Sequence, residues 1–503
     1  MKMKAFIGAM LVGLISYGVV LARPEETPDY LAVVRAYADA MIEHGRDRYG
    51  EEHSPLFAAA LDRETMTLSP REESRRAFGA IPGVREHDRS LGGANPYEHR
   101  GLYAILYQLT ELTGEGRYAE EADKALKFFF TRCQHPRTHL MPWGEHLYWD
   151  FHTDNWSASD PNGPVRDTHE ISGPWPFWDA CYRLAPDASW RFAIAQWDHQ
   201  VACKETGAFC RHARFSRHGP GRLTEFPRYA GQMIENWADS YARPENADRE
   251  RRDELPRAIA VLVGRMEANM ELTETGYLPA GRDRGNHFDI VWPGSNLELA
   301  RCLWEAARLL DETHRELAER MRRLALRQDA TFFEAPHRIT SGGGFVATLD
   351  SRTGQPRERC TNRPYTETWD TGYGHGIHAG LANQLYARQE QLQAGHPDKA
   401  AKYRTLLLAA AEQYLASEPA RDQLQKPNAL AGAIQLMLNA HRITDDQRFL
   451  QRADHFARIG IDLFLDEGSP LPKATNQHGH YEAKTGGPRF VNILLQLHSA
   501  MQQ

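Results

Sequence analysis

The fold is decided by residues 428–465, which read NALAGAIQLMLNAHRITDDQRFLQRADHFARIGIDLFL. In the first half, apolar residues recur at the helical spacing i, i+3, i+4, i+7, at Leu430, Ala433, Ile434 and Met437. A short polar turn follows. A second apolar face then runs through Phe449, Ala453, Phe456, Ala457 and Gly460. The stretch therefore predicts a helical hairpin with helices over 428–442 and 446–465.

The second helix of this hairpin has a counterpart far upstream. Its buried positions recur with the same offsets at Tyr118, Ala122, Ala125, Leu126 and Phe129. In both places the preceding turn contains a Thr and then an Arg followed by an aromatic residue, and a Thr or Asp there can cap the new helix. Because one hairpin cannot bury its apolar face alone, two copies predict a repeated unit, although a chance match is the alternative.

Helical periodicity extends over most of the chain, in the segments 27–46, 97–113, 117–132, 170–184, 187–205, 227–242, 252–273, 294–311, 313–333, 376–390, 398–417, 428–442, 446–465 and 482–501. Long loops rich in Gly, Pro, Trp and His lie between them, and residues 344–355 could form a small hairpin. We expect an all-α protein, an (α/α) barrel of six hairpins, or seven, with the long loops at one rim. An open α-solenoid is the alternative, but its fixed repeat length is missing.

The N-terminus predicts export. Lys2 and Lys4 precede an apolar run over residues 5–22 that ends in small residues, as in a signal peptide. We expect residues 1–22 to be removed near Ala22, which leaves residues 23–503 as one catalytic domain, secreted or periplasmic and without a membrane span. An uncleaved membrane anchor is the alternative.

Composition narrows the classes of partner and cofactor. The formal net charge of −7 argues against nucleic acid, which needs a basic face. Six cysteines are too few for a disulfide scaffold; Cys203 and Cys210 form the nearest pair, but no connectivity follows. No His-Glu-x-x-His or four-ligand spacing occurs, so we expect neither a metal site nor a cofactor, with calcium left open if the protein is a lyase. The oligomeric state does not follow from the sequence.

The richest loop, between residues 134 and 178, combines tryptophans with acids. Sugar rings stack their C–H faces on aromatic rings, so we expect the tryptophans in this loop to line a glycan site, namely Trp143, Trp149, Trp175 and Trp178. Packing in the core is the alternative for each. A glycosidase needs one protonated and one ionised carboxyl group, and the acidic and basic candidates are Glu145, Asp150, His169 and Glu170. Glu170 is expected at the start of a helix, with Thr168 as its cap.

A basic segment follows between residues 211 and 231. Arginine forks bind carboxylates in a bidentate manner, so Arg214, Arg217 and Arg228 are candidates for binding a uronic acid. His218 and Tyr229 form with Arg228 a set that could transfer protons in a β-elimination. A solvated charged surface is the alternative interpretation.

Other loops that precede helices complete the predicted cleft. They contribute the substrate-binding candidates Glu98, His99, His287, Trp292 and Trp369. Alternate connections in a ring of hairpins lie at the same rim. We therefore expect the loops at 141–178, 211–229, 286–295 and 362–375 to meet.

Four motifs carry a family resemblance. Gly92–Arg100, Trp143–Asp150, the segment 224–237 and His480–Ala483 resemble bacterial secreted six-hairpin (α/α)-barrel enzymes that degrade glycans. The chain is similar to the β-glucuronidases of glycoside hydrolase family 154 and to pectate-lyase-like relatives. The resemblance implies an enzyme that acts on a uronic-acid-containing oligo- or polysaccharide.

The motifs and the paired carboxylates together favour a glycoside hydrolase. The alternatives are a polysaccharide lyase, which would use His, Tyr and Arg, and a non-catalytic glycan-binding protein. An unsaturated product would distinguish the lyase from the hydrolase.

Overall fold

The computed structural model describes residues 28–69, 78–158, 167–170, 173–220, 225–281, 288–358, 363–370 and 378–503. Within these ranges the α-helices are α1 (Tyr30–Glu43), α3 (Arg100–Thr113), α4 (Arg117–Arg132), α5 (Trp178–Leu184), α6 (Pro186–His199), α7 (Pro227–Ala242), α8 (Glu254–Met270), α9 (Pro293–Leu310), α10 (Arg315–Glu334), α11 (His378–Leu392), α12 (Pro397–Leu415), α13 (Pro427–Thr444), α14 (Gln447–Phe464) and α15 (Gly487–Met501).

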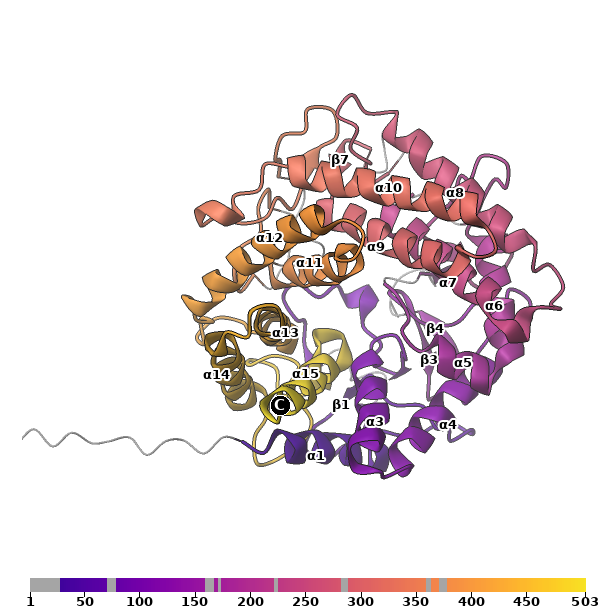
Figure 1. The fold of residues 1–503 in the computed structure, drawn as a ribbon. Helices are drawn as coiled ribbons and strands as arrows, with labels where there is room; N and C mark the ends of the chain where they lie inside the picture. Colours follow the sequence, from indigo (N-terminus) through magenta and orange to yellow (C-terminus); the bar gives the residue numbers. More distant parts are fainter. Residues whose placement is uncertain are drawn as a thin grey trace, which may run out of the picture.

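These helices pack in pairs around a ring (Figure 1). The pairs are α1 with α15, α3 with α4, α5 with α6, α7 with α8, α9 with α10, α11 with α12, and α13 with α14. An inner layer runs from α7 through α9, α11, α13 and α15 to α3, and the ring closes through α4, α5 and α6. The predicted (α/α) barrel is therefore confirmed, and among the described helices the number of pairs is the larger of the two expected.

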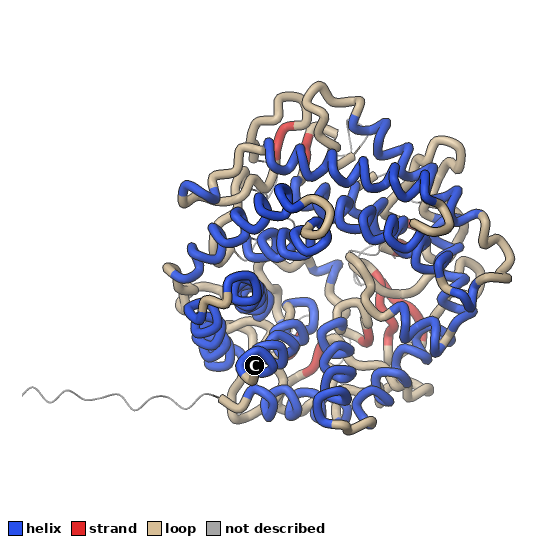
Figure 2. Tube along the Cα trace, in the orientation of Figure 1, coloured by secondary structure: helices blue, strands red, loops and turns tan. Residues whose placement is uncertain are grey.

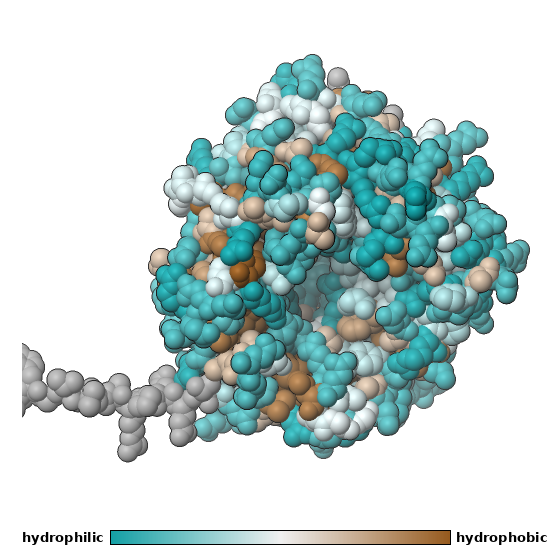
Figure 3. All heavy atoms as spheres, viewed as in Figure 1, coloured by the Kyte–Doolittle hydropathy of each residue, from teal (hydrophilic) through white to brown (hydrophobic). Residues whose placement is uncertain are grey.

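The hairpin that decided the prediction forms as expected. Helices α13 and α14 pack together, and the apolar faces read from the sequence are buried, with Leu430, Ile434, Met437, Phe456 and Ala457 all at 0% exposure. Asp446 caps α14 by accepting a hydrogen bond from the backbone N–H of Arg448 at 2.9 Å. The surface view in Figure 3 is mostly hydrophilic and is hollowed at the centre of the ring.

Short strands occupy the loops rather than the walls (Figure 2). Antiparallel pairs join β1 (Ala60–Leu61) to β9 (Tyr481–Glu482), β5 (Thr168–His169) to β6 (Ala213–Arg214), and β7 (Ile290–Val291) to β8 (Leu349–Asp350). A three-stranded sheet has the order β2 (Gly93–Ala94), β3 (Leu147–Asp150) and β4 (Asn155–Ala158). These pairs tie loops that are far apart in the sequence to one another.

Three helix boundaries differ from the sequence prediction. The helix expected over 170–184 begins only at Trp178, because Thr168 and His169 form a strand and Glu170 forms a bridge with Gly144. Thr168 therefore caps no helix. The helix expected over 187–205 ends at His199, and the last helix begins at Gly487 instead of 482, because Tyr481 and Glu482 pair with β1.

The structure tests the predictions about the N-terminus, a membrane span and the cysteines only in part. The expected signal peptide, residues 1–22, lies outside the described residues. No helix in the described ranges is long and apolar enough to cross a membrane. Cys203 and Cys210, the nearest pair in the sequence, are both free thiols.

Candidate functional site

Glu170 lies at the centre of a buried polar cluster. Strand pairing explains its position: β5 ends at His169 and pairs with β6, while Glu170 itself bridges to Gly144. This arrangement brings the loop that contains His146 and the loop that contains Arg211 and His212 to opposite sides of one carboxylate. The Glu170 side chain is 0% exposed.

Four side chains contact the Glu170 carboxylate. Its Oε2 lies 3.1 Å from His146 Nε2 and 2.6 Å from His212 Nε2. Its Oε1 accepts a hydrogen bond of 2.8 Å from Arg211 Nη1 and another from the hydroxyl of Tyr229. Arg228 in turn donates to the Tyr229 oxygen at 3.1 Å. One carboxylate therefore organises two imidazoles, a guanidinium and a phenol.

The charges in this cluster are unequally distributed. Burial alone would raise the pKa of Glu170, but Arg211, His212 and the histidine hydrogen bonds outweigh it and hold that pKa well below its usual value. Burial would lower the pKa of His146, yet contacts with Asp88, Glu170 and Glu145 raise it to about 9. For His212, burial prevails and the pKa is lowered. At neutral pH, Glu170 is thus ionised, His146 carries a proton and His212 is neutral.

A second carboxylate, Glu145, borders the same cluster. Arg85 binds Glu145 through Nη2 and donates from Nε to Asp88 Oδ2 at 2.6 Å. Arg211 Nη1 lies 3.7 Å from Glu145 Oε2, so one guanidinium faces both glutamates. Asp88 is 0% exposed and lies in the short 3-10 helix η1 (Glu86–Asp88). Arginines thus compensate the acids along this wall.

A second charged pair, Glu98 and Lys484, lies near Asp88 and Glu145. Their Oε1 and Nζ atoms lie 3.5 Å apart, and the Glu98 side chain is only 4% exposed. Burial raises the pKa of Glu98 to about 8, against the opposing effect of Lys484. Glu98 is therefore the carboxyl group of this region that retains a proton at neutral pH.

Inner helices begin at the rim where these residues lie. Glu98 and Lys484 immediately precede α3 and α15, Tyr229 lies in the first turn of α7, and the backbone N–H of Arg228 donates to Ser295 Oγ at the start of α9 at 3.3 Å. A helix N-terminus carries partial positive charge. Several of them at one rim favour an anionic ligand there.

His146, Glu170 and His212 form a plausible metal-binding set. Their ligand atoms all lie within 4.8 Å of one another, and all three residues are at least three-quarters buried. Two imidazole nitrogens and one carboxylate oxygen suit zinc or a first-row transition metal better than calcium, which takes oxygen ligands. The donor set therefore fits a borderline divalent cation.

Some predicted site residues come together in this cluster. Glu145, Glu170, Tyr229 and Arg228 all belong to it, and Glu98 lies beside it, paired with Lys484. The loops at 141–178, 211–229 and 286–295 meet, because Phe226 also contacts Trp292 with ring centroids 5.0 Å apart. In the part of the chain that the structure describes, the fourth loop, 362–375, does not contact the cluster.

Other predicted site residues make contacts that support the fold. Asp150 is fully buried and accepts hydrogen bonds from the backbone of His152 and Thr153, which shapes the β3–β4 turn. His169 accepts a hydrogen bond from Trp143, and His99 lies 3.2 Å from the hydroxyl of Tyr481. Burial lowers the pKa of both histidines to about 3.

The tryptophans divide between core and cavity. Trp143 and Trp149 are 0% and 3% exposed and belong to the main hydrophobic core, as their alternative interpretation had it. Trp175 and Trp178 line a separate cavity of about 390 Å³ beside α5, α7 and α9. Trp369 packs between Tyr414 and Phe456. The described contacts of the Glu170 carboxylate are with other side chains than these rings.

The basic segment also divides. Arg217 is exposed and lies 3.7 Å from Asp167, and the exposed His218 packs against His199. Arg214 lies in β6 opposite Thr168. Arg228 contacts Tyr229, but His218 packs against His199, so the predicted set of three is assembled only in part. His287 lies outside the described residues.

Three residues that surround Glu170 most closely carry little sequence signal. Arg211 and His212 open the basic segment, but they lack the flanking glycines and aromatics of their neighbours. His146 directly follows Glu145, but one more histidine in a chain with 23 of them is not distinctive. Asp88 and Lys484 carry no local signal, because only the closed ring brings them to the site.

A family comparison covers the part of the chain that builds this cluster. Residues 88–237 match the model of a family described as periplasmic pectate lyase. The match spans less than half of the chain, yet it includes Asp88, Glu145, His146, Glu170, Arg211, His212 and Tyr229. The resemblance to pectate-lyase-like enzymes is thus confirmed, whereas the similarity to β-glucuronidases stays a prediction.

Comparison with solved structures gives matches of low identity over most of the chain. An unsaturated glucuronyl hydrolase specific for heparin has 10% identity and a TM-score of 0.47, over 94% of this chain and 98% of that one. Cellobiose 2-epimerase from Bacillus thermoamylovorans has 11% identity and a TM-score of 0.43, over 94% and 99%. An unsaturated glucuronyl hydrolase from Streptococcus agalactiae has 11% and 0.41, over 94% and 92%. At these values the similarity does not extend to activity.

Proposed function

We propose that the protein is a polysaccharide lyase that cleaves a uronate polymer such as pectate by metal-assisted β-elimination. The observation that carries the proposal is the buried set of His146, Glu170 and His212 with Arg211 beside it. The match of residues 88–237 to periplasmic pectate lyases supports the same reaction. A periplasmic location agrees with that description and with the expected signal peptide.

The chemistry requires three events. A base removes the proton from the carbon beside the uronate carboxylate, the bond from the neighbouring carbon to the glycosidic oxygen breaks, and that oxygen gains a proton. A double bond remains in the new non-reducing end. When bound, a divalent cation supplies the electrophile that acidifies the proton beside the carboxylate.

The residues of the chain take defined parts in this scheme. His146, Glu170 and His212 hold the cation. Arg228 lies within reach of a substrate carboxylate at the entrance of α7, where the helix N-terminus adds positive charge. Arg211 and Tyr229 both donate hydrogen bonds to Glu170, and we assign the proton transfers of the elimination to these two groups.

Hydrolysis is the second candidate, and one observation favours it. A glycosidase needs a carboxyl group that keeps its proton, and Glu98, whose pKa burial raises to about 8, does so. Glu98 would be the acid and Glu145 the base. The earlier candidates for the acid fit less well, because Glu170 is held ionised and Asp150 shapes a turn. A glycan-binding protein without activity would have no need for this cluster of titratable groups.

The product of the reaction separates the candidates. We expect metal-free protein to be inactive on pectate and the addition of Mn²⁺ to start a rise in far-ultraviolet absorbance from the unsaturated product. Release of saturated uronate without that absorbance, with or without metal, would instead establish hydrolysis.

Variants test the metal-binding set. His146→Ala and His212→Ala should each lower activity by at least about a hundredfold and abolish tight Mn²⁺ binding, because each removes a ligand. His218→Ala is the matched control, since this exposed histidine lies in the same basic segment but packs against His199. Equal loss of activity in the control would contradict the assignment.

A further inference from the structure

We propose that Asp88 is a positioning residue for the metal site. It contacts His146 on the Nδ1 side of the ring, orients the ring and so fixes which nitrogen binds the cation. This inference rests on the proposed function in one respect only, namely that His146 is a metal ligand. The residues that carry it come from three separate parts of the chain: η1, the loop before β3, and the bridge at Glu170.

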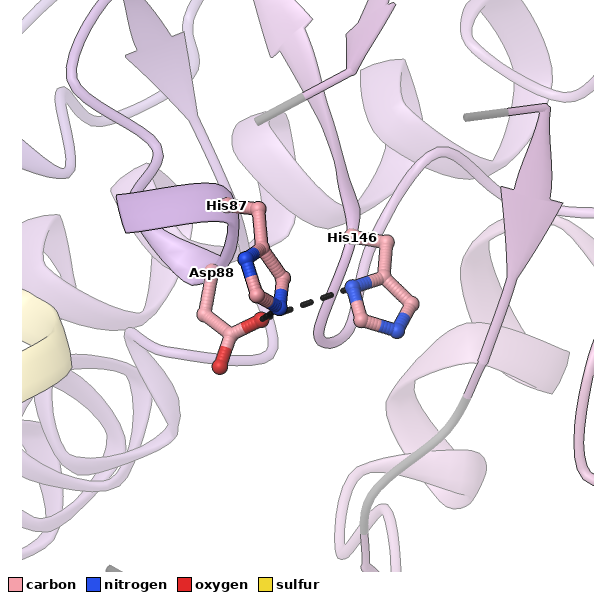
Figure 4. Close-up of side chains that lie close together, drawn as sticks. All are labelled: His87, Asp88 and His146. Atoms are coloured by element: carbon pink, nitrogen blue, oxygen red, sulfur yellow. Dashed lines mark ion pairs between the residues drawn. The ribbon is translucent and has the colours of Figure 1, made fainter. Parts of the chain in front are cut away.

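The two ring nitrogens of His146 face different carboxylates. Nε2 lies 3.1 Å from Glu170 Oε2, on the side of the metal set, while Nδ1 lies 3.4 Å from Asp88 Oδ1. Figure 4 shows the Asp88 carboxylate beside the His146 ring, with the dashed line joining it to Nδ1. Asp88 is 0% and His146 3% exposed, so water does not compete for this contact.

Asp88 is itself held firmly. Its second oxygen, Oδ2, accepts a hydrogen bond of 2.6 Å from Arg85 Nε, and the same guanidinium binds Glu145 on the wall of the site. Asp88 therefore cannot turn away from His146 without breaking its contact with Arg85. Rigid support of this kind is what a ligand needs to keep its geometry when the cation leaves.

The arrangement matches the way in which proteins tune metal-bound histidines. A ligating imidazole usually donates its other N–H to a carboxylate, which fixes the tautomer and makes the ligating nitrogen more basic. A bound cation would take the place of the Nε2 proton next to Glu170 and His212, and the proton that remains on the ring would be the one on Nδ1, which lies 3.4 Å from Asp88 Oδ1. Asp88 thus selects the tautomer that the metal set requires.

A competing interpretation places a second cation behind His146. His87, Asp88 and His146 also have ligand atoms within 4.8 Å of one another, and His87 Nε2 lies 3.6 Å from Asp88 Oδ1. Two cations would then share the His146 ring, which would have to lose both N–H protons. We assign Asp88 to the orienting role because it leaves one proton on the ring and binds one cation.

The test measures Mn²⁺ binding to the full-length mature protein without substrate, by calorimetry and by the electron paramagnetic resonance signal of free Mn²⁺. We expect one ion per chain. Asp88→Asn should weaken the affinity roughly 10- to 100-fold, the effect typical of lost outer-shell partners, with an unchanged circular dichroism spectrum. Asp88→Glu should restore part of the affinity, because it restores the carboxylate.

His87→Ala is the matched control and should leave both the stoichiometry and the affinity unchanged. Two ions in the wild type and one in His87→Ala would overturn the proposal in favour of the second site. Wild-type affinity in Asp88→Asn, with binding lost in His212→Ala, would also overturn it. If Asp88→Asn weakens binding but no uronate polymer is eliminated, the proposed function fails and this inference stands.

Discussion

Tyr229 is the residue whose contacts most directly suggest a chemical step. Its hydroxyl donates to Glu170 Oε1, whereas both histidines approach Oε2, so the phenol does not occupy the metal-facing oxygen. Tyr229→Phe should therefore leave Mn²⁺ affinity nearly unchanged and lower kcat on pectate by about 10²- to 10⁴-fold, the usual contribution of a general acid or base.

Tyr148→Phe provides the comparison, because its hydroxyl contacts Asp150 in the β3–β4 turn rather than Glu170. If Tyr229→Phe keeps full activity while Arg211→Lys loses it, the guanidinium and not the phenol accepts the proton. Steady-state rates with saturating Mn²⁺ distinguish these outcomes.

Site residues that stand in a recognisable local sequence pattern could be predicted. Site residues that come together only when the ring of helices closes could not. Glu145, Glu170 and Tyr229 were chosen from the sequence because acids and phenols stood among aromatics and glycines. The tryptophans beside them shared that signature but belong to the core or line another cavity, since loop aromatics in a closed barrel also fill space. His146 and His212 come together only because the Gly144–Glu170 bridge and the β5–β6 pairing bring their loops to Glu170.

The contact between helices α3 and α15 positions the part of the site that holds Glu98 and Lys484. A Cβ at Gly101 would lie 2.4 Å from the carbonyl oxygen of Pro488, so a side chain there would force the two helices apart. Glu98 and Lys484 immediately precede these helices. We expect Gly101→Ala to destabilise the protein by about 1–3 kcal/mol, as overpacking does, and to lower activity.

Gly116→Ala controls for the change of residue type, because the added Cβ would meet only a flexible glutamate tip at 3.8 Å. Urea unfolding and pectate turnover, measured on both variants, check the prediction. Equal stability of the two variants would mean that the α3–α15 approach relaxes without cost.

Helices could be predicted from the sequence because each carries its own 3.6-residue pattern, as α13 and α14 illustrate. The strands could not, because β5 and β9 are two residues long and exist only through partners far along the chain. Glu170 was therefore assigned to a helix start, although the strand pairing is what delivers it to the site.

At the scale of the whole molecule, ring closure joins the two ends of the described chain. Arg89 binds Glu482 through two guanidinium nitrogens, at 3.0 Å from Nε and 2.6 Å from Nη2, and both side chains are 1% exposed. Removing one member of a buried ion pair leaves the other uncompensated. Closure of the ring therefore also positions the site, because Lys484 lies only two residues after Glu482.

The free energy of unfolding should fall both when the pH is lowered and when it is raised from an optimum. Burial lowers the pKa of His99 and His169 to about 3, so between about pH 6.5 and 3 the unfolded chain binds protons that the folded chain excludes. Stability should therefore fall as the pH is lowered through 6.5, with each histidine contributing about 1.4 kcal/mol per pH unit. Burial has the opposite consequence for Glu98, whose folded pKa of about 8 lies above its unfolded value near 4.3.

Glu98 therefore makes the protein less stable as the pH rises from about 4.3 to 8, while the two histidines make it less stable below 6.5. Where the two pH ranges overlap, the change in stability caused by the two histidines exceeds the opposite change caused by the one glutamate. Stability should thus be greatest near pH 6.5, and urea unfolding at a series of pH values measures it. Glu98→Gln should make the alkaline side of the profile less steep, leaving there the contribution of His146, whose folded pKa of about 9 also lies above its unfolded value near 6.5, and it should leave the acidic side to the buried histidines. An equally steep fall above pH 6.5 in this variant would show that Glu98 does not titrate there.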